Sequence, residues 1–437
     1  MNDSTKTPLL VIGDAPSAIS GLGRICRDLS TRIAEHMSDI FEVATLGYGG
    51  HGDRNLPFLQ YHIEGMENWY LPTLPQVWEN FAGKRKGVVL TIWDASRLLW
   101  FARPDNQHWC HDANMRAWLS NAPFQRWGYF PMDALGPHGR LSVMNRECLL
   151  GYDRILAYSH WAEKMISGSM LPEDSEKRAL TFLPHGIDTD VFKPRDQAHS
   201  RKIFHSTLAF KGPEIREEER IIGIVATNQA RKDFGLGIES VAKVAQTMPI
   251  RLFIQTDILE RHWSIPALLM DYGILPRAIV SGLQVSDEVM SYVYSACDLT
   301  LGIGAGEGFG YPLAESIACG TPVIHGDYGG GAEFLPKKFL INPSAYRTEG
   351  TYNALRPVFQ IGDWVKKIRE IIGKSATLPE HLDWNVLWPR WEQYLRQGHE
   401  SFLTVKAKPE YNRASPVLAG GEPSSEDKSD NDALQPI

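Results

Sequence analysis

Two glutamates, Glu307 and Glu315, stand eight residues apart in the glycine-dense segment DLTLGIGAGEGFGYPLAESIACGTPVIHGDYGGGAE, residues 298–333. The segment predicts a strand end, a glycine loop carrying Glu307, and a helix that begins near Pro312 and ends at Gly320, with Glu315 in its first turn. Glycines let a backbone approach a ligand closely, and a helix N-terminus presents free N–H groups. The pattern favours a polyhydroxylated, phosphorylated ligand. A plain strand–turn–helix unit with two solvated glutamates is the alternative.

Positive charge is concentrated at Arg231 and Lys232, between a predicted strand at 221–226 and a predicted helix at 234–245. Adjacent cations directly after a strand can bind a diphosphate. A solvated basic surface would show the same sequence pattern and is the alternative. Near the chain start, a strand at 8–13 is followed by the turn Gly21-Leu22-Gly23 and an amphipathic helix. This arrangement can also bring N–H groups to a phosphate, or it can be an ordinary tight turn.

Acidic residues follow two further predicted strands. Asp94 ends the strand at 87–93, and Asp133 follows the strand in the segment WGYFPMDALG. In parallel α/β sheets ligands gather at the carboxyl ends of the strands, so both are candidate site residues, although Asp94 could equally cap the next helix. His111 lies between them among other histidines and aspartates, but no tight ligand spacing supports a metal site there.

The alternation of strands and helices in two halves, continued by a helix at 287–296, favours an α/β fold with two Rossmann-like domains. A chain of 437 residues also fits two domains. We expect the following boundaries: a first Rossmann-like domain at 1–192, a linker region at 193–219, a second Rossmann-like domain at 220–383, a C-terminal helix at 384–405, and a disordered tail at 406–437.

Composition narrows the class of protein. Hydrophobic residues make up 43% of the chain and charged residues 22%, which is typical of a soluble globular protein. The net charge of −7 provides no overall attraction to nucleic acid or anionic membranes. Five cysteines without a C-x-x-C pair indicate reduced thiols. Because neither a signal peptide nor a stretch of ~20 apolar residues is evident, we expect a cytoplasmic protein without a transmembrane segment.

The string E-G-F-G-x-P-x-x-E-x-x-A-x-G-x-P-V-I, followed by G-G-x-x-E, resembles the E-x7-E signature of family-4 (group 1) retaining glycosyltransferases. The resemblance implies the GT-B fold, in which two Rossmann-like domains face a central cleft and C-terminal helices cross back to the first domain. It implies that the domain at 1–192 is the acceptor side, that the domain at 220–383 binds the nucleotide sugar, and that the helix at 384–405 packs back on the first domain. It implies that Glu307 lies beside the donor sugar, with Gly308, Phe309 and Gly310 in the donor site, and that Glu315 binds the ribose.

The same resemblance assigns other residues. Lys232 matches the lysine that binds the donor phosphates, and Asn228 belongs to the same donor-binding loop. The family's usual arginine is replaced by Thr227, so Arg231 is the substitute. Relatives have a first-domain histidine near the acceptor that has no secure match here. The catalytic candidates are therefore Glu307, Asp133, Asp94 and His111, and the turn Gly21-Leu22-Gly23 is the phosphate loop.

The resemblance predicts a retaining enzyme that moves a hexosyl or pentosyl unit from a nucleotide sugar to a hydroxyl of a glycan, lipid, small metabolite or modified nucleobase. We expect Arg231, Lys232 and helix N-termini to neutralise the diphosphate, with no metal and no cofactor beside the donor. A GT-B phosphorylase, a nucleotide-sugar epimerase and a non-catalytic sugar-nucleotide-binding protein stay open as alternatives. The basic run Lys84-Arg85-Lys86 keeps a hydroxymethylated base in DNA open as the acceptor. Nothing in the sequence indicates the oligomeric state.

Overall fold

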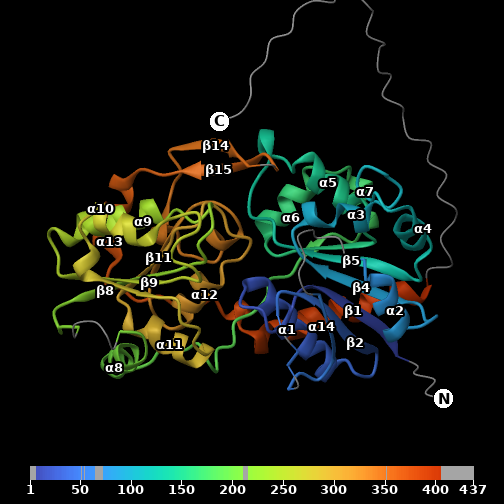
Figure 1. The fold of residues 1–437 in the computed structure, drawn as a ribbon, viewed down its shortest axis with the longest axis horizontal. Coiled ribbons are helices and arrows are strands. Elements are labelled where there is room, and N and C mark those ends of the chain that lie inside the picture. Colours follow the sequence, from blue (N-terminus) through green and yellow to red (C-terminus); the bar gives the residue numbers. More distant parts are fainter. Residues whose placement is uncertain are drawn as a thin grey trace, which may run out of the picture. The chain divides into compact units, whose positions relative to one another are not determined.

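Two parallel β-sheets with helices on their faces form the framework of the computed structural model, which describes residues 6–50, 52–53, 55–63, 72–209, 215–350 and 352–404 (Figure 1). Within these ranges the first sheet has seven strands in the order β3-β2-β1-β4-β5-β6-β7, and the second has six in the order β10-β9-β8-β11-β12-β13. Each sheet begins in its middle and grows first to one side and then to the other, which is the doubly wound Rossmann pattern. The predicted α/β fold with two Rossmann-like halves is confirmed.

The first sheet is covered on both faces, with α1 on one side and α5 and α6 on the other (Figure 1). Its central strands β1 and β4 are buried almost throughout, which explains their unbroken apolar sequences. This sheet and its helices are formed by β1 (Thr7–Asp14), α1 (Gly21–His36), β2 (Phe41–Tyr48), β3 (Leu59–Ile63), α2 (Leu74–Phe81), β4 (Gly87–Ile92), α3 (Leu99–Ala102), α4 (Ala113–Asn121), β5 (Phe124–Phe130), α5 (Val143–Leu150), β6 (Arg154–Ala157), α6 (His160–Ser167), α7 (Pro172–Lys177) and β7 (Thr181–Phe182).

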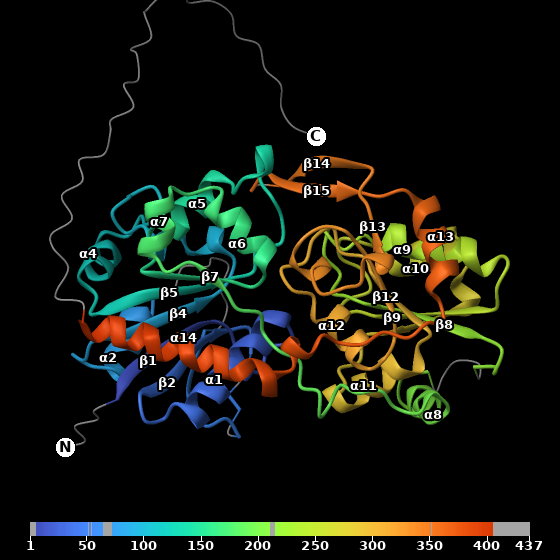
Figure 2. The same ribbon diagram turned by 180° about the vertical axis from the view of Figure 1, so that it is seen from behind.

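The second sheet has α9, α10 and α13 on one face and α8 and α11 on the other (Figure 2). Its elements are α8 (Gln197–Leu208), β8 (Arg220–Val225), α9 (Phe234–Ala245), β9 (Ile250–Gln255), α10 (Ile265–Asp271), β10 (Ala278–Ser281), α11 (Asp287–Ala296), β11 (Leu299–Gly302), α12 (Tyr311–Ala318), β12 (Val323–Gly326), β13 (Leu340–Ile341) and α13 (Ile361–Ile371). An antiparallel hairpin, β14 (Ala345–Glu349) and β15 (Ala354–Val358), stands between β13 and α13.

Two segments differ from the sequence-based expectation. The polar stretch at 193–219, predicted as a linker region, contains α8, whose buried Phe204 packs edge-on against Phe253 with ring centroids 4.9 Å apart. Exposed residues of α8 such as Lys202 and Ser206 account for part of this polar sequence, whereas Ser200 of the same helix is buried. The hairpin β14–β15 was not among the predicted elements. The predicted disordered tail at 406–437 lies outside the described residues.

The last helix, α14 (Trp384–Thr404), starts by packing on the first sheet, as the predicted fold requires. The indole Nε1 of Trp391 donates a hydrogen bond of 2.9 Å to the carbonyl of Pro184, and its ring lies edge-on to Tyr129. Arg154, at the start of β6, donates from Nε to the hydroxyl of Tyr394 at 3.3 Å. Residues 384–395 therefore return from the second half of the chain to the first.

Among the helices that the described residues form, none is both long enough and apolar enough to cross a bilayer. All five cysteines are buried and free of disulfide bonds, in agreement with the expectation of reduced thiols. Burial raises the pKa of each thiol, most strongly at Cys26 and Cys148. The thiols therefore act as small apolar side chains.

Candidate functional site

Glycines shape the loop that carries Glu307, between β11 and α12. Gly306 has φ 126°, and a Cβ atom there would collide with the carbonyl oxygen of Asp133. Gly310 is the N-cap of α12 with φ 87°, in the left-handed region that favours glycine. Behind the loop, the second glycine turn supports it, because the N–H of Gly331 donates to the carbonyl of Glu307 at 3.2 Å. The loop can adopt this path only with glycine at these positions.

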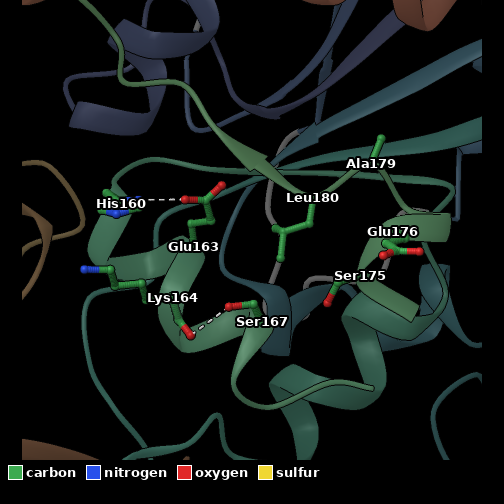
Figure 3. Close-up of a pocket in the computed structure, with 8 residues that line it drawn as sticks. All are labelled: His160, Glu163, Lys164, Ser167, Ser175, Glu176, Ala179 and Leu180. Carbon is green, nitrogen blue, oxygen red and sulfur yellow. Dashed lines mark hydrogen bonds and ion pairs between the residues drawn. The ribbon is translucent and has the colours of Figure 1, made fainter. Parts of the chain in front are cut away.

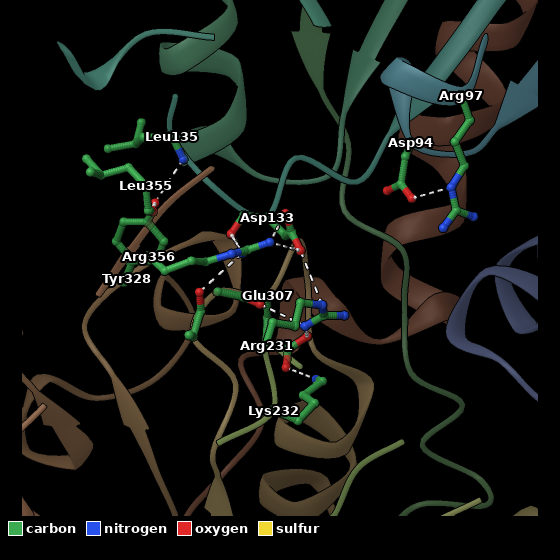
Figure 4. A network of polar contacts seen from close by, with 12 residues as sticks. Asp94, Arg97, Asp133, Leu135, Arg231, Lys232, Glu307, Tyr328, Leu355 and Arg356 are labelled. Atoms are coloured by element: carbon green, nitrogen blue, oxygen red, sulfur yellow. Dashed lines mark hydrogen bonds and ion pairs between the residues drawn. The ribbon is translucent and has the colours of Figure 1, made fainter. Parts of the chain in front are cut away.

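The carboxylate of Glu307 meets the predicted basic pair, and we refer to Asp133, Arg231, Lys232 and Glu307 as the Glu307 cluster (Figure 4). Lys232 Nζ contacts one carboxylate oxygen, and Arg231 Nη1 lies 3.2 Å from the other. Arg231 also reaches Asp133, with its Nε 3.4 Å from the carboxylate. The side chains of Glu307 and Lys232 are only 12% and 10% exposed, so solvent screens these ion pairs weakly.

The backbone aligns the basic pair with the glycine loop. The N–H of Ala305 donates to the carbonyl of Arg231 at 2.8 Å, and the N–H of Asp233 donates to the carbonyl of Ile303 at 3.0 Å. The Asp233 carboxylate then caps α9 by accepting from the N–H of Leu236. The segment after β8 thus lies alongside the segment after β11, at the carboxyl ends of neighbouring strands.

Opposing effects set the protonation states in the Glu307 cluster. Burial acts to raise the pKa of Glu307, but attraction to Lys232 and Arg231 outweighs it and lowers this pKa to about 2. Burial, reinforced by repulsion from Arg231, lowers the pKa of Lys232 to about 8, despite the opposite effect of Glu307. For Arg231, burial acts to lower the pKa and the carboxylates of Glu307 and Asp133 raise it above its ordinary value. At neutral pH the ionised Glu307 carboxylate therefore faces two cations, Lys232 and Arg231.

Glu315 was predicted in the first turn of α12, but the helix begins at Tyr311 and Glu315 is its fifth residue, just past that turn. Its side chain is buried and already engaged. Its Oε2 accepts a hydrogen bond of 2.8 Å from the Tyr294 hydroxyl, and its Oε1 contacts Nη1 of Arg24. The same guanidinium lies 2.5 Å from Asp287 through Nη2. Burial raises the pKa of Glu315, and Arg24 opposes this rise. The carboxylate proposed for the ribose is therefore held by side chains of α1 and α11.

The three first-domain candidates lie in different surroundings. Asp133 follows β5 and belongs to the Glu307 cluster. Asp94 precedes a short 3₁₀ turn, does not cap it through its side chain, and forms a separate ion pair of 3.2 Å with Arg97 while 43% exposed (Figure 4). His111 is exposed on the loop before α4, where its carbonyl accepts from Arg116 at 2.9 Å. The Glu307 cluster forms without Asp94 or His111.

The predicted phosphate loop is the N-terminus of α1. Ser20 caps this helix, because its Oγ accepts from the N–H of Gly23 at 2.9 Å and donates to Asp14 at 2.5 Å. A Cβ at Gly21 would lie 3.7 Å from the Tyr311 ring, so the turn is close to the start of α12. Leu22 packs against the apolar core of the first sheet. The N–H of Gly23 is thus used for capping, and the turn faces α12.

Other predicted donor residues are packed inside the protein. Asn228 is fully buried, and its amide nitrogen donates to the carbonyls of Ile258 and Trp263 at 3.0 and 2.7 Å. It orders the loop after β9. The ring of Phe309 lies against His185 with centroids 3.9 Å apart. A Cβ at Gly308 would lie 3.1 Å from Cα of Pro131, so this glycine allows two loops to pack together.

Sequence reasoning missed several residues around the two glutamates. Arg24 directly follows the turn at 21–23, and that position was the available signal. Asp287 and Tyr294 give no sequence signal, because only the packing of α11 beside α12 brings them to Glu315. His325 at the end of β12 is buried, its Nδ1 donates to the carbonyl of Gly302 at 2.6 Å, and burial lowers its pKa. It is therefore neutral at physiological pH.

Two other features lie apart from the predicted site. A pocket of about 400 Å³ lies between α6 and α7, lined by charged and small polar side chains, and none of the predicted site residues contributes to it (Figure 3). In the predicted basic run, Arg85 pairs with Glu42 at 2.6 Å and donates to the carbonyls of Phe81 and Ala82.

Within the described part of the chain, no group of three or more acidic, histidine or cysteine side chains is arranged to hold a metal ion.

Residues 206–343 match a family model described as glycosyl transferases group 1. One similar protein is a D-inositol 3-phosphate glycosyltransferase of Mycobacteroides abscessus, 27% identical over 218 residues. That alignment covers 48% of this chain and 43% of the relative, so this chain spans less than half the length of the protein it matches.

Solved structures share the architecture over nearly the whole chain. Sucrose-phosphate synthase from Thermosynechococcus elongatus superposes with a TM-score of 0.63 at 17% identity, covering 91% of this chain and 100% of that one. The Anabaena protein HepE in complex with UDP-glucose gives a TM-score of 0.63 at 12% identity, covering 89% and 99%. At such low identity these similarities show the fold, which is GT-B.

Proposed function

We propose that this chain transfers a sugar from a nucleotide-sugar donor to an acceptor hydroxyl, with retention of the anomeric configuration and without a metal ion. The match of residues 206–343 to the glycosyl transferases group 1 model and the GT-B fold support this proposal. The observation that carries the proposal is the Glu307 cluster, in which two cations and a carboxylate meet on a glycine loop at the ends of neighbouring strands. We infer that Arg231 and Lys232 bind the donor diphosphate there.

Leaving-group stabilisation is the chemistry this arrangement favours. As the glycosidic bond breaks, negative charge develops on the departing diphosphate, and fixed cations in a weakly solvated site stabilise it. Lys232 and Arg231 are held by Glu307 before the donor arrives, so they require little reorganisation. Glu307, whose pKa is held at about 2, remains ionised. It is a poor proton acceptor and suits the stabilisation of positive charge on the sugar.

Retention of configuration and the ribose contact rest on the motif resemblance. In this proposal the acceptor attacks from the face that the diphosphate leaves, and Asp133 lies on the acceptor side of Glu307. Glu315 receives the ribose hydroxyls after Arg24 withdraws from it. UDP-glucose is the first donor to test because HepE is solved with it, and D-inositol 3-phosphate is the first acceptor because relatives are named for it.

The test measures nucleotide binding and nucleotide release for the wild type and two lysine variants, with EDTA present. Lys232→Met removes a cation from the cluster, whereas Lys243→Met removes an exposed lysine of α9 that pairs with Glu239 and serves as the matched control. We expect UDP to raise the melting temperature of the wild type and of K243M, and to have little effect on K232M. Proton NMR of the product reports the anomeric configuration.

Each rival function has its own outcome. Acceptor-dependent UDP release with a retained anomeric configuration supports the proposal, and an inverted product contradicts retention. Release or rearrangement of the sugar without an acceptor indicates hydrolysis or an epimerase, and a requirement for inorganic phosphate indicates a phosphorylase. Failure of a folded wild type to bind any nucleotide would overturn the donor site.

A further inference from the structure

The hairpin β14–β15 is attached to the loop after β5. The backbone N–H of Leu355 donates to the carbonyl of Leu135 at 2.7 Å. The Tyr328 hydroxyl joins the same two segments, because it accepts from the N–H of Leu135 at 2.9 Å and donates to the carbonyl of Leu355 (Figure 4). The hairpin therefore supports the segment that carries Asp133.

Arg356 of β15 is the residue through which the hairpin reaches the Glu307 cluster (Figure 4). Its Nη1 donates to the carbonyls of Asp133 and Ala305, both at 3.2 Å. Its Nη2 lies 3.4 and 3.5 Å from the two carboxylate oxygens of Asp133. The side chain is 12% exposed. One guanidinium thus contacts the side chain and backbone of Asp133 and also the loop that leads to Glu307.

Asp133 stands between two arginines that differ in what else they contact. Arg231 divides its guanidinium between Asp133 and Glu307, and under the proposed function it also receives the donor diphosphate. Arg356 is directed to Asp133 and to two carbonyl groups, and Glu307 is not among its contacts in the described structure. When a diphosphate draws Arg231 away, Arg356 is the cation that stays with Asp133.

We propose that Arg356 is a positioning residue for glycosyl transfer, which holds Asp133 in place on the acceptor side while the donor occupies Arg231. This inference rests on the proposed function. It also gives the hairpin a role. Strands β14 and β15 lie between β13 and α13, and β15 places the buried guanidinium of Arg356 beside Asp133. Loss of Arg356 should then impair turnover and acceptor use and leave donor affinity almost unchanged.

The test compares Arg356→Gln and Arg356→Lys with Arg347→Gln. Arg347 lies directly across the hairpin from Arg356 in the strand register, is 68% exposed and pairs with Glu349, so R347Q is a matched control. The measurements are the Kd for UDP, kcat and KM for release of UDP from UDP-glucose with D-inositol 3-phosphate, and crystal structures with UDP.

We expect R356Q to lower kcat about tenfold to a hundredfold, because small misplacements of a site residue have effects of this size, with the Kd for UDP changed less than about twofold. R356K should recover part of kcat, since it restores the charge but not the two-pronged contact. R347Q should match the wild type. In the wild-type UDP complex, Arg231 should contact the diphosphate and Arg356 should keep Asp133.

The split between kcat and the Kd for UDP separates positioning from a structural effect. A substitution that only loosens the site would also weaken UDP binding, and kcat would not recover in R356K.

Four results would overturn the inference. R356Q could weaken UDP binding as strongly as K232M, which would make Arg356 a donor ligand. It could behave like R347Q. It could lower kcat with no recovery in R356K, or the UDP complex could show Arg231 still on Asp133. Each of these presupposes a wild type that binds UDP. A wild type that does not bind UDP refutes the proposed function itself, and this inference with it.

Discussion

Arg24 in the first turn of α1 forms a buried ion pair with Glu315 of α12, 291 residues later in the sequence. The guanidinium also contacts Asp287 at the start of α11 and lies over the rings of Phe192 and Tyr311 at 5.2 and 5.0 Å. One side chain of the first Rossmann-like half therefore neutralises two carboxylates of the second. The contact joins the two halves, and under the proposed function it is released when the ribose binds Glu315.

Arg24→Met should lower the free energy of unfolding by about 3–5 kcal/mol, because it leaves a buried carboxylate without its cation. The cost should be smaller when Glu315 is also changed to Gln, and urea unfolding of the two single variants and the double variant measures the coupling. Additive effects of the two substitutions would contradict a direct interaction.

The destabilisation by R24M should also depend on pH. Burial holds the pKa of Glu315 above its ordinary value, so the folded state retains this proton longer than the unfolded state and loses stability as pH rises through that range. Without Arg24 the pKa rises further. The difference in stability between R24M and the wild type should therefore be larger at pH 8 than at pH 5. A difference that shrinks with rising pH would refute this assignment.

Donor affinity should fall on the alkaline side through Lys232. Burial and Arg231 lower the pKa of this amine to about 8, so raising the pH through 8 removes a positive charge that the diphosphate needs. The Kd for UDP should increase between pH 7 and pH 9, and in Lys232→Arg it should stay flat because arginine remains charged. Titration calorimetry at both pH values checks this. An equal rise in Kd for both proteins would assign the pH effect to another group.

Glu307 should stabilise the protein at neutral pH and lose this effect in acid. Its pKa is held at about 2 in the folded state, against about 4.3 in an unfolded chain. Glu307 therefore contributes about 3 kcal/mol to the free energy of unfolding. This contribution is complete above the unfolded pKa and disappears as pH falls toward 2. Glu307→Gln should therefore be less stable than the wild type at pH 7 and nearly as stable near pH 2.5. Denaturant midpoints at the two pH values test this.

Local signals explain which elements were predictable. The bounds of α9 and α11 match the sequence-based prediction to the residue, because Asp233 and Ser286 cap them through side-chain hydrogen bonds within the same turn. The Glu307 loop and the start of α12 could also be predicted, because Gly310 and Pro312 are local signals for the beginning of a helix. Turn chemistry acts over three or four residues and is visible in the sequence.

The parts that were missed depend on distant contacts. Strand β14 is almost entirely exposed, so its residues show no alternation of apolar and polar side chains and gave no strand signal. Arg356 is informative only once β15 lies beside the loop after β5. Likewise, nothing near Glu315 in the sequence indicates Arg24. Partners that a sheet or a helix pair brings together from far along the chain cannot be read from spacing.

The return of α14 to the first sheet should contribute strongly to stability through Trp391, which is fully buried. Trp391→Ala removes a large side chain and leaves the carbonyl of Pro184 without its indole donor, so it should cost about 3–5 kcal/mol. Trp391→Phe keeps most of the apolar volume and loses the hydrogen bond, for about 1–3 kcal/mol. Val386→Ala, at an exposed position of the same helix, is the control. If W391A unfolds at the same urea concentration as V386A, the start of α14 does not anchor the first sheet.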